Sequence, residues 1–160
     1  MLAELNLDSR DVAAYIVKYC AYKNYFINLT KLQKILYCCY GAVLADSDAR
    51  LTKEHPKAWD HGPVFPRVYN LKTKNPDGFI QGLIEREEHI KDILSSRVMI
   101  AINATIDLFS KYTAGALVEW THRPVSPWYK CTDGGKNLYG EIPDELIREY
   151  FLTFINKQDK

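Results

Sequence analysis

The sequence predicts a mainly α-helical protein, a compact single-domain bundle of about six helices with one or two short strands near residues 50–60. Apolar side chains recur at the spacing of one helix face in segments that cover much of the chain. Residues typical of helix caps and turns separate these segments. The 160 residues suffice for one hydrophobic core and contain no internal repeat or low-complexity linker, so we expect a single domain over residues 1–160.

The first helix is expected to follow Asp8, whose carboxylate suits an N-cap. Val12, Ile16 and Cys20 then recur at four-residue spacing and form one apolar stripe. We expect this helix to end near Lys23 and Asn24.

The second helix is predicted to begin at Thr30. Thr30 and Gln33 have the spacing of a capping box, in which each side chain bonds an unpaired backbone amide of the first turn. The apolar stripe that follows continues to Ala45.

The segment after the second helix loses helical periodicity. Residues 57–60 are expected to be a short strand or extended chain. Pro63 and Pro66 are tolerated in the first turn of a helix, so we predict a short helix from about Pro63 to Leu71. Residues 75–78, Asn-Pro-Asp-Gly, have the composition of a turn.

The second half of the chain predicts three further helices. The charged stretch 85–89 is expected to be a solvated face. A long helix should run from about Ser96 through Lys111, and the next from an N-cap at Thr113 to about His122.

Pro124 and Pro127 are expected to hold the following segment out of helix. Residues 133–135 predict a turn, and the last helix should start near Pro143.

Composition restricts the classes of function. Lys and Arg number 21 against 20 Asp and Glu, without the basic excess of a dedicated nucleic-acid-binding protein. None of the four cysteines forms a CxxC pair, which favours reduced, packed thiols over a zinc site or a disulfide framework. No signal peptide or membrane-length apolar run is present in the sequence, so we expect a cytoplasmic protein.

The sequence contains no nucleotide-binding or serine-hydrolase motif. Cys38 and Cys39 lie in an apolar helix, where burial makes a thiol inert. Glu119 and His122 could share a helix face, which leaves a hydrolase or transferase as the rival hypothesis. We predict no enzyme activity and neither a metal nor a cofactor.

Two segments, 58–66 and 121–128, combine Trp, His and Pro on loops that enter or leave a helix. One interpretation is that Trp59 and Trp128 fill the core while the prolines shape the connections. The other is a preformed patch in which an aromatic ring and a histidine anchor a protein partner.

These segments also carry a family resemblance. Residues 30–37 with Tyr40-Gly41, the pattern AW..GPV.P.VY at residues 58–69, and Leu117 with Thr121-His122 and Pro127-Trp128 resemble three blocks of the Panacea (SocA-like) antitoxin domain, in the same order. Ile142 and Tyr150-Phe151 fit its closing helix. Phe109-Ser110 departs from a Tyr-Gly pair of the family, and Thr113 stands where serine is common.

The resemblance implies an antitoxin that neutralises a cognate toxin by direct binding and is often carried by phages or mobile elements, as in relatives called GepA-like. A proteolytic adaptor that delivers the toxin to a cellular protease is an alternative. The candidate partner-binding residues are Trp59, His61, Pro63, Arg67, Tyr69, His122, Arg123 and Trp128. Alternatively, the motifs hold the scaffold and the partner binds elsewhere.

A DNA binder would require one basic face from Lys53, Lys57, Arg67, Lys72 and Lys74. The oligomeric state is left open.

Overall fold

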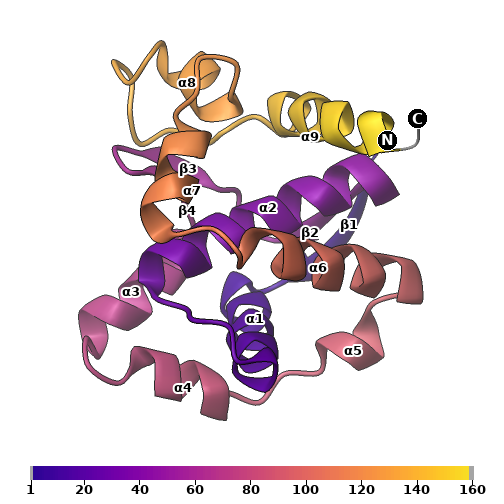
Figure 1. Ribbon diagram of the computed structural model, residues 1–160, viewed down its shortest axis with the longest axis vertical. Helices are drawn as coiled ribbons and strands as arrows, with labels where there is room; N and C mark the ends of the chain where they lie inside the picture. Colours follow the sequence, from indigo (N-terminus) through magenta and orange to yellow (C-terminus); the bar gives the residue numbers. More distant parts are fainter. Residues whose placement is uncertain (1, 159–160) are drawn as a thin grey trace.

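The computed structural model describes residues 2–158. Helix α2, Leu29–Ser47, runs through the middle of the molecule (Figure 1). All residues from Lys31 to Gly41 are buried, as expected of a helix covered on every side. The helices α1 (Ser9–Lys23), α6 (Ser96–Phe109), α7 (Ala114–Thr121) and α9 (Asp144–Gln158) pack against it. The core is therefore built around α2.

Two small sheets complete the fold. Strand β1, Ala3–Leu7, pairs in parallel with β2, Ala49–Thr52. Strands β3, Lys57–Trp59, and β4, Gly62–Val64, form an antiparallel hairpin that contacts α7 and α8 (Pro127–Thr132). Figure 1 shows the hairpin, α7 and α8 gathered at one end of α2.

The mainly helical, single-domain prediction is confirmed, and six helix boundaries agree closely. Asp8 caps α1 by accepting from the N–H of Arg10, and Asn24 ends that helix in the left-handed conformation. Thr113 caps α7 through the N–H of Ala116, and the helix ends at His122. The long helix predicted from Ser96 is α6, and the last helix begins directly after Pro143.

The structure corrects the start of the second helix. Asn28, not Thr30, is the N-cap, and its side chain accepts from the N–H of Lys31. The predicted capping box is wrong because Gln33 bonds the backbone of Phe65 instead.

The predicted helix over Pro63–Leu71 is wrong at its start. Pro63 lies in β4, opposite Ala58, and α3 spans Pro66–Lys74 with Pro66 in its first turn. Pro127 likewise begins α8 rather than excluding it, since a first-turn proline lacks only an N–H that has no partner there.

Three helices of the described chain were not predicted: α4 (Phe79–Glu85), α5 (Ile90–Ile93) and α8, each of seven residues or fewer. The charged stretch 85–89 is not fully solvated, because Glu88 is 9% exposed and pairs with Lys18 at 2.7 Å.

Candidate partner interface

The β3–β4 hairpin gains a third, strand-like partner from residues 139–142. Ala58 donates its N–H to the carbonyl of Gly140 at 2.8 Å, and Tyr139 donates to the carbonyl of Ala58 at 2.7 Å. Strand β3 therefore lies in the middle. Strand β4 is at the edge, where Pro63 is tolerated despite lacking an N–H.

Gly62 makes the tight hairpin turn possible. Its φ of +109° lies in a region that side chains rarely adopt. A Cβ there would fall 2.7 Å from the Thr121 hydroxyl and 2.9 Å from Cε of Lys34. The glycine lets the hairpin backbone lie directly against α2 and α7.

Side chains at the end of α7 and in α8 lie against carbonyls of the hairpin. The indole Nε1 of Trp128 donates to the carbonyl of Trp59 at 2.7 Å. The Nε2 atom of His122 lies 2.8 Å from the carbonyl of Asp60. The ring of His122 also lies against the indole of Trp128, with centroids 4.0 Å apart.

Two buried side chains of α2 also bond the backbone of the hairpin and of the residue after it. Lys34 donates from Nζ to the carbonyl of Pro63 at 3.1 Å. Gln33 donates to the carbonyl of Phe65 at 3.1 Å and accepts the Phe65 N–H at 2.8 Å. We call Gln33, Lys34, His122 and Trp128 the hairpin clamp. Residues from all three sequence blocks thus converge on one short segment of backbone.

The clamp contains a buried lysine and an imidazole that faces two carbonyls. Burial lowers the pKa of Lys34 to about 8, because the apolar surroundings disfavour the ammonium form. His122 faces carbonyls with both ring nitrogens, since Nδ1 lies 2.6 Å from the carbonyl of Val118. A neutral imidazole donates from one nitrogen only, whereas the doubly protonated ring donates from both.

The eight candidate residues separate into three groups by exposure. Pro63 and Trp128 are buried, Trp59 and His122 are half-buried, and His61, Arg67, Tyr69 and Arg123 are exposed. The buried members and His122 shape the hairpin, so they form a scaffold. The exposed members are available to a partner.

Arg67 is exposed but already paired. Its guanidinium lies 3.0 Å from Asp8 and 2.9 Å from Glu54. These two carboxylates neutralise one of the five cations that a DNA-binding face would need.

The exposed side of the hairpin carries three aromatic rings that touch edge to face. Trp59 packs against Tyr69 of α3 with centroids 5.0 Å apart, and against Tyr139 at 6.3 Å. We call Trp59, Tyr69 and Tyr139 the aromatic patch. Tyr139 was not predicted as a site residue, because it belongs to no motif and its place beside Trp59 follows only from the long-range pairing with β3.

A family model for the SocA-like antitoxin, Panacea domain, matches residues 32–129, which include the four clamp residues and two rings of the aromatic patch. The chain belongs to the SocA-like Panacea antitoxin family. The relative "Antitoxin SocA" from Caulobacter vibrioides (strain NA1000 / CB15N) is 30% identical over 161 aligned positions, covering 91% of this chain and 83% of the relative. No solved structure matches the chain.

The rival enzyme hypothesis placed acid–base chemistry on Glu119 and His122 of this Panacea domain. Glu119 does line a cavity of about 440 Å³ between α6, α7 and α9, together with Arg123 and a set of aromatic side chains. His122 is not among the residues that line it, because its ring is turned toward the hairpin. In the described part of the chain, no hydrogen bond or ion pair joins the two side chains.

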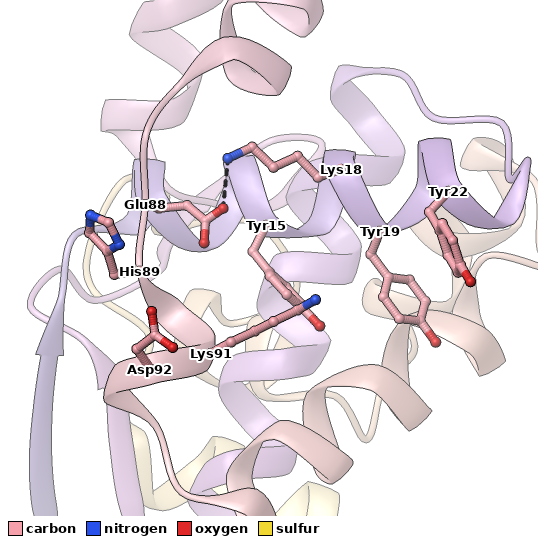
Figure 2. A pocket seen from close by; sticks show the side chains of 8 residues that line it. All are labelled: Tyr15, Lys18, Tyr19, Tyr22, Glu88, His89, Lys91 and Asp92. Carbon is pink, nitrogen blue, oxygen red and sulfur yellow. Dashed lines mark hydrogen bonds and ion pairs between the residues drawn. The ribbon is translucent and has the colours of Figure 1, made fainter.

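A second cavity of about 390 Å³ lies between α1 and α5 (Figure 2). Tyr15 and Tyr19 line it on the α1 side, and their hydroxyls donate to Asn103 and Asp107 of α6. Lys18 crosses its rim to Glu88 (Figure 2). The phenol groups therefore hold α1 against α6 and are already satisfied.

The cysteines of the Panacea domain are free thiols. Burial raises the pKa of Cys38 and Cys39, which keeps these thiols protonated and unreactive. Within residues 2–158, no three His, Cys, Asp or Glu side chains are grouped so as to hold a metal ion. No helix of that range is long and apolar enough to span a membrane.

Proposed function

We propose that this chain is an antitoxin that neutralises a cognate toxin by direct binding, and that the contact surface is the aromatic patch with the hairpin tip at His61. Membership of the SocA-like Panacea family supports the antitoxin role. The hairpin clamp supports the location, because it fixes the backbone at Trp59, whose half-buried ring contacts the exposed rings of Tyr69 and Tyr139.

A surface held in this way binds with little loss of conformational entropy. Tyr and Trp are also the residues that contribute most often to the binding energy of interfaces. The proposed place of action is the cytoplasm, where free thiols such as those of this chain remain reduced. A phage or mobile element is the proposed genetic context.

The test is co-expression with the product of the neighbouring gene, scoring growth rescue and co-purification. Rescue with a stable complex is the expected result. Rescue without a complex would favour the protease adaptor. A neighbour that is harmless alone, or that kills despite this chain, would contradict the antitoxin role.

The surface is tested by Tyr69→Ala, with Tyr22→Ala as the matched control. Tyr22 is 83% exposed on α1, away from the hairpin, so its removal should leave neutralisation intact. Tyr69→Ala should weaken the complex about tenfold or more. Equal neutralisation by both variants would contradict the proposed surface.

A further inference from the structure

Tyr139 holds a backbone conformation that its side chain disfavours. Its φ is +76°, in the left-handed region. Four other non-glycine residues of the described chain share a positive φ, and all four are Asn or Asp, which tolerate it best: Asn6, Asn24, Asp48 and Asp133. Tyr139 is the exception, and the hydrogen bonds to β3 on either side of it hold it there.

Core packing does not account for a tyrosine at this position. Tyr139 is 61% exposed, and Figure 1 places the end of α8 and the chain that follows at the outside of the molecule. The ring does contact Trp59, edge to face. A glycine or asparagine would make the same turn with less backbone strain. Strain retained at an exposed aromatic residue points to a role in binding.

Three aromatic rings elsewhere in the described chain already receive a cation from this chain. Lysine ammonium groups lie over Tyr15, Tyr19 and Phe26 at 6.0, 5.6 and 5.9 Å from the ring centroids. No Lys or Arg lies over a ring of the patch in the part of the chain that the structure describes. The patch therefore has room for a cation from outside.

Two exposed carboxylates lie close to the patch along the chain. Asp60, which follows Trp59, has a side chain that is 60% exposed and pairs with His61, which is 81% exposed. Glu141 is exposed two residues after Tyr139 and faces Lys57 across an isolated bridge. Cations bind best over tryptophan, and a nearby carboxylate strengthens the attraction.

We propose that the aromatic patch receives an arginine or lysine side chain of the toxin, and that Tyr139 is a contact residue for that cation. This inference rests on the proposed antitoxin function. It names the chemistry of the partner: a toxin segment that places a basic side chain on Trp59 and Tyr139, with Asp60 beside it.

The first test is Tyr139→Gly, with Tyr139→Phe beside it. Glycine relieves the backbone strain and removes the ring, whereas phenylalanine keeps both. The melting temperature of Tyr139→Gly should stay within roughly 4 °C of the wild type, since the lost ring contact and the relieved strain oppose each other. Its dissociation constant for the purified product of the neighbouring gene should rise about tenfold or more, and that of Tyr139→Phe should stay within about threefold.

Asn24→Gly is the matched control for the glycine substitution. Asn24 is another left-handed residue, at the end of α1, and its replacement should leave binding unchanged. Asp60→Lys tests the charge of the partner. It should weaken binding about tenfold or more, because the new ammonium group would repel the basic side chain of the partner. Asp77→Lys, in the turn before α4, makes the same charge change as its control.

The outcomes separate the two hypotheses. If the wild-type chain does not bind or neutralise the neighbouring product, both the proposed function and this inference fail. If the wild type binds and Tyr139→Gly binds equally well, only the role of Tyr139 is refuted. If Tyr139→Gly weakens binding but Asp60→Lys does not, the partner group is not a cation, and the proposal that the patch receives a basic side chain is refuted.

Discussion

Lys34 gives the sharpest test of the hairpin clamp. It is 2% exposed and its described partner is the carbonyl of Pro63. Replacing it with methionine keeps a long, unbranched side chain and removes the charge. The pKa of Lys34 falls from its ordinary value of 10.5 to about 8 on folding, so the wild-type chain and the variant should differ in how their stability depends on pH.

The direction of this pH dependence follows from the pH range in which the folded and the unfolded chain each hold the proton of Lys34. Below pH 8 Lys34 is protonated both folded and unfolded, so its contribution to the free energy of unfolding is constant. Between pH 8 and 10.5 the unfolded chain holds the proton and the folded chain does not, so the wild type gains stability relative to Lys34→Met as pH rises. The total gain is about 3 kcal/mol, and it is complete above pH 10.5.

The assay is urea unfolding of both proteins at intervals from pH 7 to 11. Subtracting one curve from the other cancels the titration of groups that the two proteins share. A difference that stays constant within about 0.5 kcal/mol, or that falls as pH rises, would refute the burial of a charged lysine under the hairpin.

Three further predictions concern the scaffold. Gly62→Ala should lower the free energy of unfolding by about 2–4 kcal/mol in chemical denaturation, because it adds both strain at positive φ and a steric clash; a loss below about 1 kcal/mol would mean that the turn relaxes freely. Trp128→Phe should cost about 1–3 kcal/mol by thermal unfolding, since the carbonyl of Trp59 loses its donor, and an unchanged midpoint would contradict that bond. Asn28→Ala should cost about 1 kcal/mol in the same assay and Thr30→Ala less than about 0.5; the reverse order would restore the capping box at Thr30.

Sequence rules succeeded where the decisive contacts are local. Asp8 and Thr113 cap their helices by bonding amides two and three residues away, which is the spacing that capping patterns describe. The same rules failed at Gln33, because its amide bonds Phe65, 32 residues further along the chain. Strand β1 was missed for the same reason, since its partner β2 begins at Ala49.

The sequence motifs indicated the region of the candidate site. They did not indicate which of its residues hold the hairpin and which face solvent. The motifs correctly marked residues that meet in space, yet a Trp or His in a loop has the same pattern whether its polar atom bonds a carbonyl or faces solvent. Trp128 donates to the hairpin and His122 turns its Nε2 toward it, whereas Tyr69 and His61 are exposed. Tyr139 could not be found from a motif at all.

Amide hydrogen exchange of the chain with and without the product of the neighbouring gene tests the central claim most directly. We expect new protection in the complex at residues 57–61, in the first turns of α3 and at residues 137–141, with the buried amides of α2 unchanged. Protection centred instead on the aromatic cavity between α6, α7 and α9, with none at the hairpin, would contradict it and leave the motif residues a purely structural role.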